Sequence, residues 1–332
     1  MFEETSPDAF WGVQTAKSNF CEEVGSYENA MSTLYMLHAA NTHGSEQDYA
    51  VTRYIAEFIN SLTNLVYIFY AIYGIRELRQ KSSRDIFRVI PYWGLMAVGI
   101  CSAAFHISLK YHTQMLDDLS MLFTTTPVLH QVLTVNASRR YSVIMAILLW
   151  SFLMILVVYH VRTDELLLHS LSFAGMVIGI GIRTMQLINA RTLAGSPARK
   201  QIWGMVRFGA VIFNLGFYLW VIDGWICGFL RSARERIGLP LAFLLELHGW
   251  YVFSFFNITF FSLSCHRNLS LKWNRWHIFT GIGAYIFIAV VDHLVSGESH
   301  DGIEEHFAWP ASWASRSVFA GSNPEEIHKK QS

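Results

Sequence analysis

Long apolar stretches recur along most of the chain, and each has about the length of a helix that crosses a membrane. Such a helix needs about 20 consecutive, mainly apolar residues, and its backbone polar groups must bond to one another because lipid offers them no partners. The pattern predicts seven membrane helices, at residues 54–75, 89–109, 116–135, 141–160, 166–188, 208–230 and an interrupted last stretch that begins at Leu241 and resumes over 276–295. We therefore expect an all-α, polytopic membrane protein.

The composition supports a membrane protein over a soluble enzyme or a nucleic-acid-binding protein. Only 15% of the residues are charged, whereas soluble domains have about 25%. The 25 basic residues are balanced by 25 acidic ones, so no net positive field favours nucleic acid. Four cysteines are too few for a disulfide scaffold. The expected surroundings of this chain are therefore a lipid bilayer.

Basic residues in the short loops predict the orientation of the helices, since Lys and Arg concentrate on the cytosolic side. The loops after the first, third and fifth predicted helices are basic, those after the second and fourth are nearly bare of Lys and Arg, and the basic loop after the sixth is the exception. We expect a lumenal N-terminal segment (1–53), a transmembrane domain (54–295) and a cytosolic C-terminal tail (296–332). The basic residues that decide this are Arg76, Arg79, Lys81, Arg84, Arg88, Arg139, Arg140, Arg191, Arg199, Lys200 and Arg207.

The last four residues contain a lysine pair, Lys329 and Lys330, at the fourth and third positions from the end. On a cytosolic tail, this spacing is typical of the dilysine signal that COPI-type machinery uses to return proteins to the endoplasmic reticulum. Lysine pairs also arise by chance in charged tails. The predicted location is the endoplasmic reticulum membrane or the Golgi.

Five polar side chains are expected at the lumenal ends of three predicted helices. Ser102 and His106 lie four residues apart on the second helix, Asp117 begins the third, and His248 and His277 belong to the interrupted last one. Residues four apart share one helix face. Ionisable side chains within membrane helices are costly and usually functional. The predicted orientation places all five groups at one depth.

Zinc-dependent hydrolysis is the chemistry that this set suits. Three neutral imidazoles leave a tetrahedral zinc ion one open position for a water whose pKa falls to about 7. An aspartate can accept the proton of that water, and a hydroxyl can donate to an oxyanion. Each histidine alone fits equally well as a hydrogen-bonded interior residue, and that reading is kept for His130, His160, His169 and His293.

Several separate motifs, taken in order, resemble those of one enzyme family. They are Phe10-Trp11-Gly12, Phe20-Cys21-Glu22-Glu23, Tyr54-Ile55-Ala56-Glu57-Phe58, Ser102-x3-His106-x10-Asp117, Glu246-Leu247-His248 and Trp276-His277. With these motifs the chain resembles the alkaline ceramidases, seven-helix zinc amidases of the superfamily that includes the adiponectin receptors. The resemblance implies hydrolysis of the amide bond of ceramide to a sphingoid base and a fatty acid.

The resemblance also implies the roles of individual residues. It makes His106, His248 and His277 the zinc ligands, Asp117 the group that handles the proton, and Ser102 the donor to the oxyanion. It further implies a disulfide between Cys21 and Cys227, in an oxidising lumen, and a calcium site, for which oxygen ligands are suitable. Asn19 stands where the family has Asp, which removes one charge from that site. The implied calcium ligands are Asn19, the Phe20 carbonyl, Glu22, Asp48 and Glu57.

Two segments depart from the family pattern, residues 24–47 and residues 251–275. We interpret both as translated introns: Val24 and Val252 fit GT codons at the starts, and the second segment is rich in Phe, Ser and Leu, as a pyrimidine-rich stretch would encode. The alternative is a pair of genuine loops of this lineage.

The second segment separates His248 from His277, which would otherwise lie four residues apart on one helix face. Two other functions therefore stay open. One is a lipid-sensing, receptor-like member of the superfamily. The other is a catalytically impaired protein whose metal site the segment splits.

Overall fold

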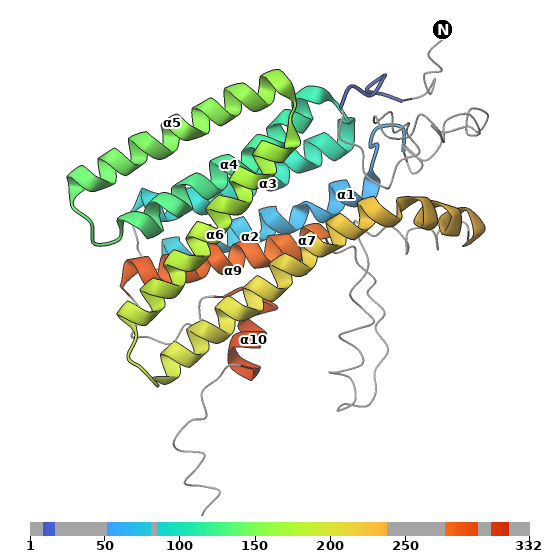
Figure 1. Ribbon diagram of the computed structural model, residues 1–332. Coiled ribbons are helices and arrows are strands. Elements are labelled where there is room, and N and C mark those ends of the chain that lie inside the picture. Colours follow the sequence, from blue (N-terminus) through green and yellow to red (C-terminus); the bar gives the residue numbers. More distant parts are fainter. Residues whose placement is uncertain (1–8, 17–51, 81–84, 238–275, 298–306, 319–332) are drawn as a thin grey trace, which may run out of the picture. The chain divides into compact units, whose positions relative to one another are not determined.

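The computed structural model describes residues 9–16, 52–80, 85–237, 276–297 and 307–318 (Figure 1). These residues form an all-α protein, as the sequence predicts. The helices are α1 (Phe58–Thr63), α2 (Leu65–Gln80), α3 (Ile86–Ser108), α4 (Tyr111–Thr134), α5 (Arg139–Thr163), α6 (Leu166–Arg191), α7 (Pro197–Ile237), α9 (Trp276–Ser296) and α10 (Ala311–Ser317).

Five stretches of the described residues are helical, long and apolar enough to cross a membrane. They are Phe58–Gln80, Ile86–Ser108, Arg139–Thr163, Leu166–Arg191 and His277–Ser296. The protein is thus a polytopic membrane protein, which confirms the predicted class. Helices α4 and α7 match two further predicted spans but are not among these five. Seven spans, the orientation of the helices and the three sequence domains stay predictions.

The chain groups into two compact units that are not continuous in sequence. Unit 1 consists of Met1–Leu65, Ile100–Asp117 and Leu215–Phe279, and unit 2 of Val66–Gly99, Asp118–Asn214 and Thr280–Ser332. Of the predicted zinc and catalytic residues, the four that the structure describes belong to unit 1: Ser102, His106, Asp117 and His277. Most of the helical length belongs to unit 2.

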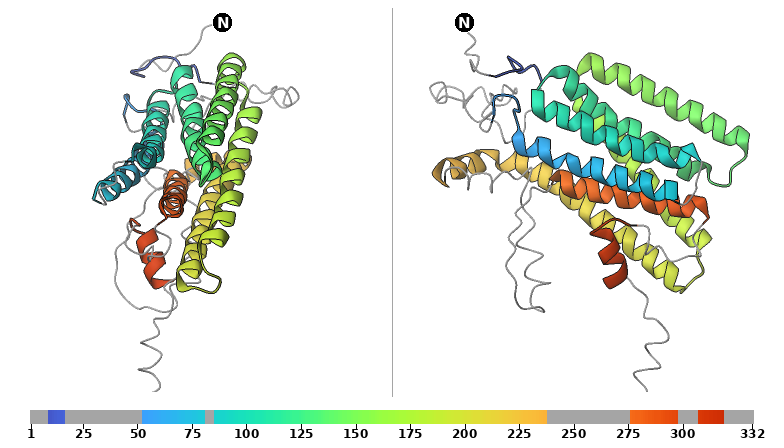
Figure 2. Two further views of the ribbon diagram at one scale, coloured as in Figure 1. Left: turned by 90° about the vertical axis from the view of Figure 1, so that its left-hand side faces the viewer. Right: turned by 180° about the vertical axis from the view of Figure 1, so that it is seen from behind.

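In unit 2, α9 lies beside α2, as the views in Figures 1 and 2 agree. The Tyr67 hydroxyl and Thr280 Oγ1 share a hydrogen bond between these helices, and the rings of Tyr70 and Tyr285 stack with centroids 4.8 Å apart. Gly281 allows the close approach, because a Cβ atom there would lie 3.3 Å from a methyl group of Val66. Contacts of this kind fix the register of α9 against α2.

A two-pronged ion pair joins α3 to α9 within the same unit. Arg88 Nε donates to Asp292 Oδ1 at 2.7 Å, and Arg88 Nη2 donates to Asp292 Oδ2 at 2.8 Å. Both side chains are largely buried, with 14% and 13% of their surface exposed. A bidentate guanidinium–carboxylate pair fixes direction as well as distance, so it holds the two helices in one register.

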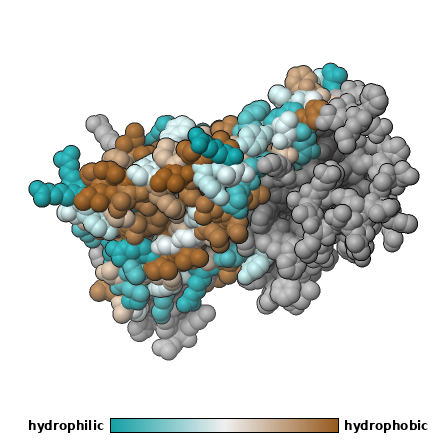
Figure 3. All heavy atoms as spheres, turned by 45° about the horizontal axis from the view of Figure 1, so that its top comes forward, coloured by the Kyte–Doolittle hydropathy of each residue, from teal (hydrophilic) through white to brown (hydrophobic). Residues whose placement is uncertain are grey.

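Helices α5 and α6 form a hairpin whose outer surface is strongly apolar. Asp164 ends α5 in the left-handed conformation, with φ 51°, and the Glu165 carboxylate caps α6 by accepting from two backbone N–H groups. Ile144, Leu148 and Ile155 are more than half exposed on α5. Apolar side chains dominate much of the described surface in Figure 3. A helix that is apolar on its exposed face suits contact with lipid.

Residues 307–318 pack against the helices of unit 2. They belong to the predicted C-terminal tail. The Tyr70 hydroxyl donates to the Trp309 carbonyl at 2.8 Å, and the Tyr285 hydroxyl accepts from the Ala308 N–H at 2.9 Å. Gln201 of α7 donates to Ser315 Oγ of α10 at 3.1 Å. This part of the C-terminal region is therefore built into the fold.

Candidate active site

The backbone before α1 crosses the end of α3 and brings Glu57 to His106. The N–H groups of Ala56 and Glu57 donate to the carbonyls of Ile107 and His106, at 3.1 and 2.9 Å. From the N-terminal segment, the N–H of Ala16 donates to the Leu109 carbonyl at 3.2 Å. The last carbonyls of a helix lack partners within it, so these bonds complete the end of α3. They place the side chains of Glu57 and His106 side by side.

His106 is buried and its ring is held through Nδ1. Glu57 Oε2 accepts from His106 Nδ1, and the Asn60 amide donates to the same oxygen at 3.1 Å. All three side chains are nearly inaccessible to solvent. A carboxylate can only accept, so the Nδ1 proton of a neutral His106 lies between the two groups and the lone pair of the ring lies on Nε2. Metal-binding histidines are commonly oriented in this way.

His277, at the start of α9, lies against His106. The two ring centroids are 5.1 Å apart and the rings are inclined by 72°. On the other side, His277 Nδ1 is 2.8 Å from Thr63 Oγ1. Among the described residues, His277 is therefore next to His106 although the two residues are 171 positions apart in sequence.

The spacing of these two rings fits the donor set of a zinc ion. With Zn–N distances of about 2.0–2.1 Å and tetrahedral angles, two imidazoles on one zinc ion have centroids about 5 Å apart. Within the described residues no three His, Cys, Asp or Glu side chains form a metal-binding group. The predicted third ligand, His248, lies outside those residues. The described residues thus supply two of the three expected ligands in fitting positions.

Ser102 and Asp117 are placed in unit 1 with the two histidines. Ser102 lies one turn before His106 on α3 and is buried. Asp117 is half-buried on α4 and interacts electrostatically with Cys101, the neighbour of Ser102. Helix α4 begins at Tyr111, earlier than the predicted start at residue 116, so Asp117 lies in its second turn. Ser102 and Asp117 thus lie on α3 and α4, and their catalytic roles stay predictions.

The calcium site and the disulfide stay predictions. Asn19, Phe20, Glu22, Asp48 and Cys21 lie outside the described residues, as do the segments 24–47 and 251–275. Cys227 lies in α7. Glu57, the implied calcium ligand that is described, binds the His106 ring in this structure.

Sequence reasoning missed Asn60 and Thr63 as parts of this site. Both lie on α1 and are buried. The spacing Glu57, Asn60, Thr63 was the available signal, because polar residues three apart lie near one face of a helix at the start of an otherwise apolar span. Their partners come from α3 and α9, which the spacing alone does not identify.

Three other histidines confirm the prediction of hydrogen-bonded interior residues. His160 Nε2 is 3.2 Å from an Asp118 carboxylate oxygen, and His169 Nε2 is 2.9 Å from the Asp118 carbonyl. His130 Nε2 is 3.0 Å from the Ser142 carbonyl. Asp118 therefore contacts a histidine of α5 and a histidine of α6. Its neighbour Asp117 points in a different direction, because successive residues of a helix point about 100° apart.

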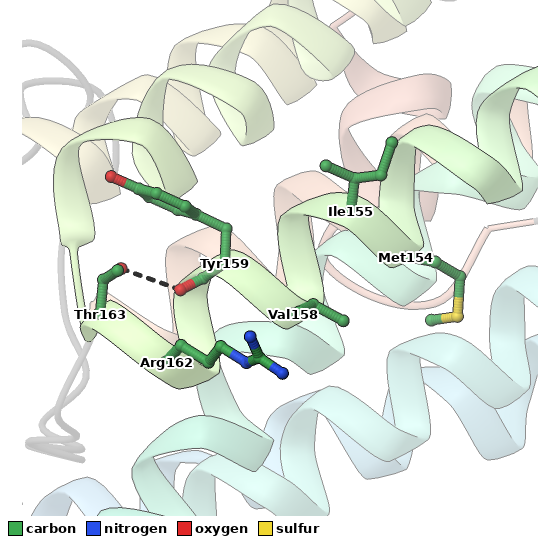
Figure 4. Close-up of a pocket in the computed structure, with 6 residues that line it drawn as sticks. All are labelled: Met154, Ile155, Val158, Tyr159, Arg162 and Thr163. Carbon is green, nitrogen blue, oxygen red and sulfur yellow. Dashed lines mark hydrogen bonds between the residues drawn. The ribbon is translucent and has the colours of Figure 1, made fainter.

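A separate shallow pocket lies on α5 and contains none of the predicted site residues. Figure 4 shows that every labelled side chain comes from this one helix, with Arg162 beside an apolar row. The Thr163 hydroxyl donates to the Tyr159 carbonyl at 2.8 Å. The lining residues are Met154, Ile155, Val158, Tyr159, Arg162 and Thr163.

Comparison with known proteins gives one consistent result. The family model described as "Ceramidase" matches residues 38–272. Mouse "Alkaline ceramidase 3" is 27% identical over 286 residues, which cover 84% of each chain. "Alkaline ceramidase YPC1" of Saccharomyces cerevisiae is 26% identical over 310 residues, covering 88% of this chain and 81% of the yeast protein. "Putative alkaline ceramidase dcd3A" of Dictyostelium discoideum is 22% identical, covering 76% and 85%.

Proposed function

Because this chain belongs to the alkaline ceramidase family, we propose that it hydrolyses the amide bond of ceramide, dihydroceramide or phytoceramide. The products are a sphingoid base and a free fatty acid. The observation that carries the proposal is the buried pair of His106 and His277, with ring centroids 5.1 Å apart. A site of this kind in a helical membrane protein suits a substrate that itself resides in lipid.

Each proposed site residue has a separate role in the hydrolysis of the amide bond. His106 and His277 would hold the zinc ion, with His248 as the third ligand. When bound, the ion would polarise the amide carbonyl as a Lewis acid and lower the pKa of a bound water to about 7. Asp117 accepts the proton from the attacking water and returns it to the leaving amine, as a general base and acid does. Ser102 donates a hydrogen bond to the oxygen that becomes negative.

Glu57 supports this site by orienting one of the proposed zinc ligands. Its carboxylate fixes the His106 ring through Nδ1 and is itself held by Asn60. A buried carboxylate next to a histidine also favours that ring's binding to a cation, since it offsets part of the charge. A calcium ion, which the family resemblance implies, would bind the N-terminal segment, with Glu57 as the ligand that joins it to His106.

The direct test is lipid release by the purified full-length protein. We expect it to release fatty acid from at least one member of a panel of ceramide, dihydroceramide and phytoceramide with different acyl lengths. A version without residues 24–47 and 251–275 serves as the comparison. Activity of both proteins supports the proposal. Activity of the shortened version alone supports the catalytically impaired alternative, and zinc and lipid binding by both without any release supports a lipid-sensing receptor.

Replacement of Glu57 by Ala is expected to lower ceramide turnover about 10- to 100-fold, the usual effect of removing a partner of a metal-binding histidine. The cause is loss of the group that orients His106. Initial rates at saturating zinc measure this loss, and Glu77→Ala on α2 is the control for loss of a carboxylate at another position. Unchanged turnover in Glu57→Ala would show that the contact with His106 has no catalytic role.

We also propose that the protein resides in the endoplasmic reticulum or Golgi membrane. The support is the lysine pair Lys329 and Lys330, which COPI-type machinery would bind on a cytosolic tail. Substitution of both lysines by Ser is then expected to move the protein toward the cell surface. Microscopy of cells that express the tagged protein measures this.

A further inference from the structure

Thr63 is a buried side chain at the last position of α1, where it joins two different helices. Its Oγ1 lies 3.0 Å from the Asn60 carbonyl of its own helix and 2.8 Å from His277 Nδ1 of α9. A threonine hydroxyl near the end of a helix often bonds only to a carbonyl one turn earlier. Here the same oxygen also reaches a predicted metal ligand.

The proton count at Thr63 decides which nitrogen of His277 carries the lone pair. A hydroxyl has one proton to donate and can accept at its oxygen, whereas a carbonyl only accepts. The Thr63 proton therefore goes to the Asn60 carbonyl, and Oγ1 accepts the Nδ1 proton of His277. A neutral imidazole has one N–H group, so the lone pair of His277 lies on Nε2.

His106 reaches the same tautomer through a different partner. Glu57 accepts the Nδ1 proton of His106, which also places that lone pair on Nε2. Two neighbouring helices of the site thus present their rings in the form that a cation needs, one through a carboxylate and one through a hydroxyl. The matching tautomers argue that both contacts serve the same ion.

The contact between Thr63 and His277 is important in this chain because a long segment precedes α9. His248 and His277 are 29 positions apart here, so the position of His277 does not follow from that of His248 by helical spacing. Within the described residues, the ring is oriented from α1 by Thr63 and packed against His106. Its position thus depends on packing between helices.

We propose that Thr63 is a positioning residue for His277, which sets the tautomer and direction of that ring and thereby raises the affinity of the site for zinc. This inference rests on the proposed zinc site. It predicts an effect on metal binding itself, before any substrate is present.

The test is zinc affinity of purified full-length protein, measured by competition with a chelating dye of known affinity. Thr63→Val keeps the shape and removes the hydroxyl, and we expect it to weaken zinc binding about 10- to 100-fold. Thr63→Ser restores the hydroxyl and should bind zinc nearly as the original does. Thr124→Val is the matched control, because Thr124 is equally buried and its hydroxyl donates to the Ser120 carbonyl of its own helix.

The outcomes separate this inference from the proposed function. If the original protein binds zinc and Thr63→Val binds it equally well, Thr63 has no positioning role, while the proposed function stands. If the original protein binds no zinc, the zinc site itself is wrong. Thermal unfolding of the metal-free proteins shows whether Thr63→Val is folded, and recovery of affinity in Thr63→Ser excludes a general packing defect. Cobalt substitution gives a second readout, since the visible spectrum of bound Co²⁺ should change in Thr63→Val and not in Thr124→Val.

Discussion

Replacement of either His106 or His277 by Ala is expected to reduce ceramide turnover at least 100-fold, because each removes an imidazole from the site. The loss of a ligand should exceed the roughly 10- to 100-fold loss caused by removing a partner of a ligand. Both variants should also lose bound zinc, measured as metal content after purification and dialysis. His130→Ala, which removes a histidine that bonds to the Ser142 carbonyl, is the control.

The His277 variant decides between the two readings of the segment before α9. If residues 251–275 split the site, loss of His277 has no effect on turnover or zinc content. If packing between helices keeps His277 beside His106, as their 5.1 Å separation indicates, both variants are equally inactive. Zinc retained at full stoichiometry in His277→Ala would overturn the assignment of this residue.

The second large effect is expected at the ion pair between α3 and α9. Replacement of Arg88 or Asp292 by Ala leaves a largely buried charge without its partner, which typically costs about 3–5 kcal/mol. We expect each single variant to unfold at clearly lower temperature in detergent. The double variant Arg88→Met with Asp292→Leu should recover much of the loss, since it leaves no unpaired charge.

The control for this pair is Arg140→Ala, which removes an exposed guanidinium at the start of α5. Its unfolding temperature should stay close to that of the original protein, since exposed charges contribute at most about 1 kcal/mol. Single variants at Arg88 and Asp292 that behave like Arg140→Ala would show that the pair does not stabilise the bundle. Additive losses in the double variant would show that the two residues act independently.

The helices and two parts of the site were predictable because they depend on short-range patterns. Apolar stretches of span length anticipate α3, α5, α6 and α9, and the four-residue spacing of Ser102 and His106 places both on one helix face. The nearness of His277 to His106 was also expected from their common depth. Chain position and depth thus account for the coarse arrangement of the site.

The partners of the two rings were not predictable, because they depend on the register between helices. The resemblance implies that Glu57 binds calcium, and this gave no sign that the same carboxylate contacts the His106 ring. Thr63 carries no motif, and its role follows only from a contact across 214 positions of sequence. Helical periodicity predicts which face of a helix a residue occupies. It does not predict the axial position of a neighbouring helix against that face.

The packing of residues 307–318 makes the cellular abundance of the protein depend on the last part of its chain. Three tyrosine hydroxyls, from Tyr70, Tyr73 and Tyr285, engage backbone groups of this segment, and Phe307 and Ala311 are buried in unit 2. A chain that ended before residue 307 would leave those hydroxyls and the apolar surface around them uncovered. Cellular chaperones and proteases act on such surfaces. A truncation before residue 307 would therefore lower the abundance of the protein, even though it removes no residue of the candidate site.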